Sequence, residues 1–142
     1  MNTSRTQQVI DQFESLNQQS VCQLINLYAS DALFKDPFNE VRGHVAIKHI
    51  FMHMFTQVNN PKFVIKSVLE NSSQTCLTWE FLFQLKSSPN KTELIRGCTW
   101  FTFNERDLII EHRDYWDAAE ELYEKLPLIG SLMKWLKKRA KL

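Results

Sequence analysis

The sequence predicts an α+β domain in which helices pack on a curved, mainly antiparallel sheet. Apolar residues recur at helical spacing in the first part of the chain, and beyond Pro61 they alternate with polar residues instead. A chain of 142 residues with a hydrophobic share of 44% can bury a sizeable core. We therefore expect residues 1–142 to form a single domain, with 118–142 as a C-terminal helical extension.

Three helices are expected before Pro61. The first two cover about residues 6–17 and 20–29, where apolar side chains are spaced by three and four positions: Val9, Ile10, Phe13 and Leu16, then Val21, Leu24, Ile25 and Tyr28. Asp36 and Pro37 interrupt this spacing, so the run before them reads as the end of a helix. The helical spacing resumes after Gly43 and ends before Asn59-Asn60-Pro61, which predicts the third helix.

Four strands are expected after Pro61, over about residues 63–69, 77–85, 97–103 and 108–116. In the last of these, alternation places five residues on one face: Leu108, Ile110, His112, Asp114 and Trp116. That face begins apolar and then carries an imidazole and a carboxylate, a mixture typical of a pocket lining. The alternative is that this end of the strand is exposed to solvent.

The C-terminal segment is expected to be helical and amphipathic. Asp117 is expected to cap a helix through Lys125, and Pro127 and Gly130 interrupt it before a final basic helix. In residues 128–142 an apolar stripe faces five basic residues: Lys134, Lys137, Lys138, Arg139 and Lys141. We favour a lid over the pocket mouth, and the alternative is contact with a membrane surface or a partner.

Composition bounds the function classes. A net charge of +1 gives no general attraction to nucleic acid. The polar N-terminus and the absence of a long apolar stretch lead us to expect a cytoplasmic protein. Three dispersed cysteines suggest neither disulfides nor a zinc knuckle, and His49 and His53 lack a third ligand nearby. We expect no metal and no cofactor.

Asp36 is the leading single candidate for chemistry. It precedes Pro37 and lies between Phe34 and Phe38, and partial burial among apolar groups suits a carboxyl that works as a general acid or base. The alternative is a turn aspartate that binds nearby backbone amides.

The segment Tyr28-Ala29-x-Asp31-Ala32-x-Phe34-x-Asp36-Pro37-Phe38, with Gly43 and the closing Asp114-Tyr115-Trp116-Asp117, resembles the NTF2-like superfamily. More closely, it is similar to the SnoaL-like and ketosteroid-isomerase-like branch. The resemblance covers roughly residues 5–117. It implies a cone-shaped α+β barrel with a deep pocket, commonly assembled as a homodimer.

The resemblance also assigns roles. It places Asp36 at the general base of ketosteroid isomerases, whose oxyanion hole is formed by a tyrosine and a protonated aspartate. Phe13 and Thr99 fall at those two positions, so efficient steroid isomerisation is not expected. Tyr28 falls at a supporting tyrosine, with Phe13 and Phe51 as its expected neighbours. His112 and Asp114 suit the acid and base of SnoaL-type cyclases, whereas Arg96 faces away from the Asp-Arg-Asp arrangement of limonene-epoxide hydrolases.

Two hypotheses follow for the function. In the first, an apolar pocket binds a small hydrophobic molecule and transforms it by acid and base chemistry, as an isomerase, cyclase or hydrolase. Its catalytic residues are Asp36, His112 and Asp114, and its ligand contacts are Phe13, Tyr28, Phe51, Trp79, Thr99 and Trp116. In the second, aromatic side chains fill the pocket, and the protein is a non-catalytic module for dimerisation and for partner or membrane contact through residues 128–142.

Overall fold

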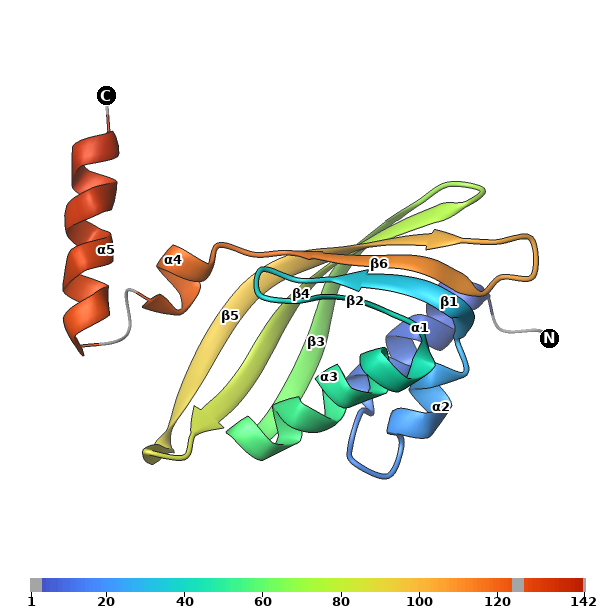
Figure 1. The fold of residues 1–142 in the computed structure, drawn as a ribbon, viewed down its shortest axis with the longest axis horizontal. Coiled ribbons are helices and arrows are strands. Elements are labelled where there is room, and N and C mark those ends of the chain that lie inside the picture. The colour runs from blue at the N-terminus through green and yellow to red at the C-terminus, as the bar shows by residue number, and fades with distance from the viewer. Residues whose placement is uncertain (1–3, 124–126, 142) are drawn as a thin grey trace.

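The computed structural model describes residues 4–123 and 127–141. Its centre is a curved six-stranded sheet with the strand order β2-β1-β6-β5-β4-β3. The strands are β1 (Tyr28–Lys35), β2 (Glu40–Arg42), β3 (Val58–Glu70), β4 (Gln74–Leu85), β5 (Ser88–Phe103) and β6 (Ile109–Tyr115). All neighbouring strands are antiparallel except β1 and β6, which are parallel. The predicted α+β class is therefore confirmed (Figure 1).

Three helices pack on the inner side of this sheet: α1 (Arg5–Glu14), α2 (Val21–Ile25) and α3 (His44–Gln57). The side chain of Ser4 accepts a hydrogen bond from the backbone of Gln7 and so caps α1. Phe13, Ile47 and Phe51 point from these helices into the core, where they meet Leu77 and Phe101 of the sheet. Figure 1 shows the long strands β3, β4 and β5 curving around α3.

The segment before Asp36 is a strand, so the prediction of a helix there is wrong. The second helix ends at Ile25, and the chain becomes extended at Tyr28. Tyr28 continues the spacing of Val21, Leu24 and Ile25 by one helical turn, which explains the error. Pairing of β1 with β6 overrides this local pattern.

The third helix is confirmed and begins directly after Gly43. Gly43 has a φ of 92°, in the region that favours glycine, and its backbone N–H donates to the carbonyl of Ala32 at 2.9 Å. The helix ends at Gln57, and β3 then starts before Pro61 rather than after it. The pairing of β3 with β4 is irregular between Asn59 and Lys62, which accommodates a proline at the edge of the sheet.

Alternation in β6 holds only after a bulge. Phe103 pairs with Ile109 and Thr102 pairs with Glu111, so the register shifts between these two pairs. As a result Ile109 is buried and Ile110 is exposed, the reverse of the prediction. Beyond the bulge His112 points to the core side, and the solvent-exposed alternative does not hold for it.

Two helices follow β6. Asp117 caps α4 (Ala118–Glu121), as predicted, but this helix is only one turn long. The predicted end of that helix at Lys125 lies outside the described residues. The final helix, α5 (Pro127–Ala140), begins at Pro127 and runs through Gly130, so the predicted interruption at Gly130 is wrong. Among the described residues, no helix is long and apolar enough to cross a membrane.

The last helix stands apart from the sheet (Figure 1). Its described side chains do not line the cavity reported below, so the expectation of a lid is wrong for them. The side chains of Ile129, Leu132, Trp135 and Leu136 are about half exposed.

Candidate active site

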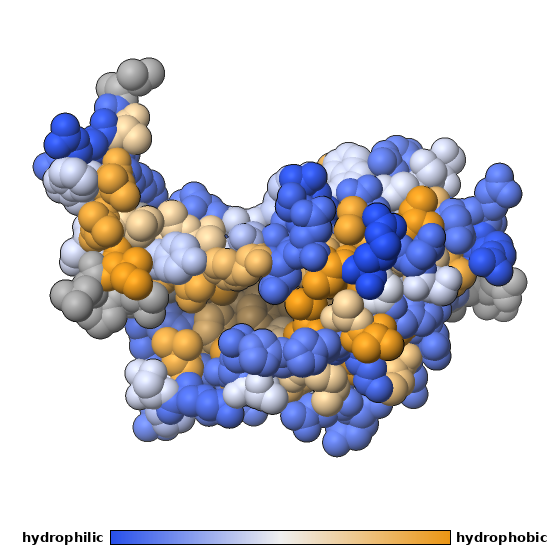
Figure 2. Space-filling model, viewed as in Figure 1, coloured by the Kyte–Doolittle hydropathy of each residue, from blue (hydrophilic) through white to orange (hydrophobic). Residues whose placement is uncertain are grey.

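A cavity of about 610 Å³ lies between α3 and the curved sheet. Its wall is mostly aromatic and aliphatic, and it reaches both Asp36 and Asp114. Figure 2 shows a hollow with apolar residues at this place. The volume falls within the range of about 300–1,000 Å³ that is usual for small-molecule sites.

Asp114 is held in place by side chains of the sheet. Its Oδ1 accepts a hydrogen bond from Thr99 Oγ1 at 2.5 Å and lies 2.8 Å from His112 Nε2. Thr99 in turn accepts from the indole Nε1 of Trp79 at 2.8 Å. Both contacts fall on one oxygen, and no donor among the described residues binds Oδ2. The second oxygen of Asp114 is therefore available to a ligand.

His112 is buried behind Asp114 and connects it to Tyr28. The Nδ1 of His112 lies 2.7 Å from the hydroxyl of Tyr28, which comes from the start of β1. The imidazole is only 2% exposed and is packed between the rings of Phe34 and Phe101, with centroid distances of 4.5 and 4.8 Å. This packing fixes the ring, so both of its nitrogens keep their partners.

The donors and acceptors along this chain of contacts can be assigned. An indole N–H can only donate and a carboxylate can only accept. The hydroxyl of Thr99 therefore accepts a hydrogen bond from Trp79 and donates one to Asp114. Burial, and secondarily the charge of Asp114, raises the pKa of Tyr28 well above 10.0. Tyr28 thus remains a neutral donor to His112 Nδ1, which leaves the Nε2 proton for Asp114.

Gly97 gives Trp79 the space that it needs. The two residues are paired across β4 and β5, and a Cβ at Gly97 would come within 2.6 Å of the indole of Trp79. The same Cβ would lie 3.0 Å from Trp116. The missing side chain therefore allows the indole of Trp79 and the Cβ of Trp116 to approach this point of the sheet.

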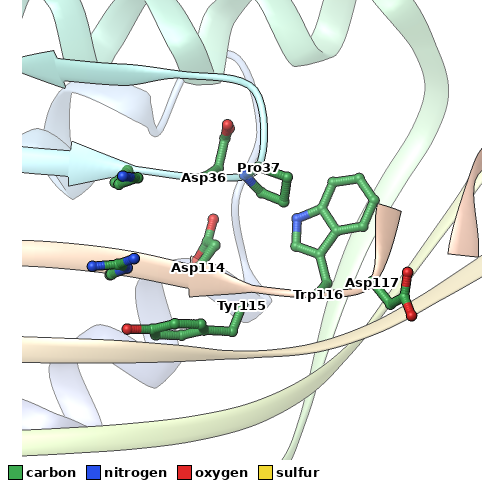
Figure 3. Close-up of a pocket in the computed structure, with 8 residues that line it drawn as sticks. Asp36, Pro37, Asp114, Tyr115, Trp116 and Asp117 are labelled. Atoms are coloured by element: carbon green, nitrogen blue, oxygen red, sulfur yellow. The ribbon is translucent and has the colours of Figure 1, made fainter. Parts of the chain in front are cut away.

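Asp36 lies on the cavity but is engaged in a turn. Its Oδ1 accepts the backbone N–H of Phe38 at 2.8 Å and that of Asn39 at 2.6 Å. The side-chain amide of Asn39 lies 3.2 Å from each carboxyl oxygen. In Figure 3 the carboxyl groups of Asp36, after the end of β1, and of Asp114 on β6 point in the same direction, with the indole of Trp116 beside them. The geometry matches the turn alternative, and a catalytic role for Asp36 stays a prediction.

The structure brings most of the predicted site residues together. Asp36, Phe51, Trp79, Asp114 and Trp116 line the main cavity. Phe13, Thr99 and His112 line a void of about 30 Å³ at its inner end. Tyr28 lies behind His112 and lines neither, so its polar partner is His112 rather than Phe13 or Phe51.

Several residues that line the cavity were not among the predicted site residues. They comprise Phe34 and Phe38 near Asp36, Phe63, Phe83 and Ile95 of the long strands, and Leu122 after α4. Strand alternation was the available signal for Phe83, which shares a face with Trp79 and Phe81. His49 and His53 lie at the mouth of the cavity, and no cluster of potential metal ligands occurs among the described residues.

The curved sheet closed by three helices defines an NTF2-like fold, with the polar chain from Tyr28 to Trp79 in its interior. The chain belongs to the SnoaL-like domain family, whose model matches residues 9–112. No curated protein matches the chain.

Solved structures of the same fold have low sequence identity. One is a protein from Catenulispora acidiphila with a ketosteroid isomerase-like fold, in complex with trimethylamine: 14% identity, 86% of this chain and 92% of that chain covered, TM-score 0.71. Another is an epoxide hydrolase/cyclase-like enzyme with a role in pyran ring formation in the polyether salinomycin: 17% identity, 80% and 90% covered, TM-score 0.68. A third, from Mycobacterium tuberculosis, is in complex with estradiol-17beta-hemisuccinate: 16% identity, 80% and 91% covered, TM-score 0.62.

Proposed function

We propose that this protein binds a small, largely apolar molecule in the main cavity and transforms it by acid and base chemistry at Asp114. His112 and Thr99 hold the carboxyl group, and Tyr28 holds His112 in the matching tautomer. The aromatic wall binds the body of the substrate and keeps water from the reacting atoms. This chemistry fits an isomerase, a cyclase or a hydrolase.

One observation carries the proposal: Asp114 touches the cavity with one oxygen fixed and the other free of partners among the described residues. Because one oxygen of Asp114 is fixed, the other points in a defined direction. Proton abstraction requires a base that is held in such a defined position. Asp36 differs, because backbone amides of its own turn bind it. The small ligands of the trimethylamine and estradiol hemisuccinate complexes, and the enzyme of pyran ring formation, support a ligand site in this fold.

A nitrobenzisoxazole is a suitable probe, since it needs only a positioned base and an apolar site. The base removes the ring C–H proton, and the electron pair of that bond forms the third bond of a nitrile. The N–O bond breaks at the same time, and the oxygen keeps its electron pair as a coloured nitrophenolate. We expect saturable turnover by the full-length protein and a loss of about a hundredfold or more in kcat for Asp114→Asn. Saturation reports binding in the cavity, and the loss of kcat reports the base.

Asp36→Asn is the matched control, because it changes the other carboxyl group of the same cavity and keeps an acceptor for the turn. We expect it to retain most of the turnover. Full activity of Asp114→Asn would overturn the assignment of the base. Loss of activity in Asp36→Asn alone would transfer that role to Asp36.

The position of α5 favours a second function. We propose that this helix binds anionic membrane surfaces. The helix has exposed apolar side chains and also carries the basic residues Lys134, Lys138 and Arg139. We expect sedimentation with vesicles that contain phosphatidylglycerol, weaker binding to pure phosphatidylcholine, and loss of binding in Trp135→Ser. Equal binding of the variant and the wild type would exclude this role.

We also propose a homodimer, as the family resemblance implies. Trp100, Ile110 and Tyr115 are exposed large side chains on strands β5 and β6, and they offer apolar area for such an interface. Light scattering on the full-length protein tests it, and a monomer at high protein concentration would contradict it.

A further inference from the structure

The main cavity contains acidic groups and no lysine or arginine among the residues that the structure describes. Its acidic groups are Asp36, directly after β1, and Asp114 of the neighbouring strand β6, and their carboxyl groups point in the same direction (Figure 3). His49 and His53 at the mouth are the other titratable side chains of its lining. The electrostatic field in the cavity is therefore that of two carboxyl groups in a mostly apolar wall.

Neither carboxyl group is paired with a lysine or arginine in the described part of the chain. Asp36 is bound by amides of its own turn, and Asp114 by Thr99 and His112. Two basic side chains line an outer groove that also includes both carboxyl groups, and there Lys35 pairs with Glu40 at 3.6 Å and Arg113 lies 5.1 Å from the ring of Tyr115. Two neighbouring carboxyl groups that lack a lysine or arginine partner favour a ligand that carries a positive charge.

Aromatic rings surround the same place. Phe34, Phe38, Trp79 and Trp116 all line the cavity together with the two carboxyl groups. The rings of Phe38 and Trp116 meet edge to face with centroids 5.6 Å apart. Ring faces carry negative charge density and attract alkylammonium groups, which also lose little hydration when they enter an apolar site. Carboxylates among aromatic rings thus form a site suited to an organic cation.

We infer that the ligand of this cavity is an apolar amine or a quaternary ammonium compound. The inference rests on the proposed function and specifies its substrate class. The cationic head lies between Asp36 and Asp114, against the indole of Trp116. The apolar body extends toward Phe83, Leu85 and Ile95, which line the part of the cavity formed by β4 and β5.

A matched pair of probes tests the inference: choline and its uncharged carbon analogue, in which a tert-butyl group replaces the trimethylammonium group. The two have the same shape and differ in charge. Binding is followed by the indole N–H signals in NMR spectra. Trp79 and Trp116 report on the cavity, while Trp100 and Trp135, about half exposed elsewhere, are internal controls.

We expect choline to shift the signals of Trp79 and Trp116 and to bind about tenfold more tightly than its carbon analogue. Asp36→Asn and Asp114→Asn should each reduce that ratio. Equal affinity for the two probes overturns the cation preference and leaves the proposed function standing. If neither probe shifts these signals while the nitrobenzisoxazole is turned over, the cation inference falls alone, and if turnover is absent as well, both fall.

Discussion

Asp36 directly follows β1, Asp114 lies on the neighbouring strand β6, and both touch one cavity, yet their carboxyl groups have different kinds of hydrogen-bond partner. Backbone amides two and three residues away bind Asp36. Side chains from other positions in the sheet bind Asp114, through a chain of contacts that extends to Tyr28 and Trp79. A local network stabilises a turn, whereas a network built from several strands fixes one oxygen and leaves the other for chemistry. The comparison shows that the origin of the hydrogen bonds distinguishes a structural carboxylate from a candidate catalytic one.

The largest effect is expected for His112→Ala, which breaks the Asp114 network at its centre. The substitution removes a buried ring from between Phe34 and Phe101 and leaves the hydroxyl of Tyr28 unpaired. We expect the free energy of unfolding to fall by about 3 kcal/mol or more. Urea unfolding measures it. His53→Ala, on the exposed face of α3, is the control, and we expect a change within about 0.5 kcal/mol.

Much of the fold follows from short-range patterns. Helical spacing predicts α1 and α3, and alternation predicts the long strands, because each pattern is set by which side of one element faces the core. The sequence misassigns β1 because its first residue also satisfies helical spacing, and only its pairing with β6 decides the matter. The bulge before His112 is invisible for the same reason, since it is defined by the register between two strands.

Tyr28→Phe is expected to have the next largest effect on stability, and that effect should depend on pH. Loss of the hydroxyl leaves His112 Nδ1 without its partner and should cost about 2 kcal/mol near neutral pH. Burial raises the pKa of Tyr28 above 10.0, so above that pH the folded state retains a proton that the unfolded state releases. The stability of the wild type therefore falls as the pH rises past 10.0, and the variant lacks this contribution.

Urea unfolding of both proteins between about pH 8 and about pH 11 provides the measurement. The gap in unfolding free energy between wild type and Tyr28→Phe should narrow over the upper part of this range. A gap that stays constant would mean that Tyr28 is not the buried neutral donor to His112.

Thr99→Val tests the opposite end of the network at an intermediate magnitude. The valine keeps the shape of the side chain but removes the hydroxyl that joins Trp79 to Asp114, and we expect a cost of about 1.5 kcal/mol. Thr99→Ser keeps the hydroxyl and should retain most of the stability. If the serine variant is as unstable as the valine variant, packing of the methyl group rather than the hydrogen bonds accounts for the loss.

The polar residues of the candidate site could be predicted from the sequence, but the hydrogen bonds that connect them could not. Alternation in β6 identifies His112 and Asp114 as neighbours on one face, and the resemblance adds Thr99 and Tyr28 by position. The bond between Tyr28 and His112 joins residues 84 positions apart, so no local pattern reveals it. For Asp36 the local structure is the predictable part, because the dipeptide Asp36-Pro37 favours a turn. Its contact with the cavity depends on the whole fold.

The smallest effect is expected at Asp36, where two substitutions separate the turn from the cavity. Asp36→Ala removes the acceptor for the amides of Phe38 and Asn39 and should cost about 1 kcal/mol, measured by urea unfolding. Asp36→Asn keeps an oxygen at the same position and should be nearly neutral, since asparagine forms the same kind of turn. A cost for Asp36→Asn equal to that of Asp36→Ala would show that the charge matters at this corner. In that case the charge of Asp36 would matter in addition to its local hydrogen bonds. The carboxyl groups of Asp36 and Asp114 would then have to be treated as one site.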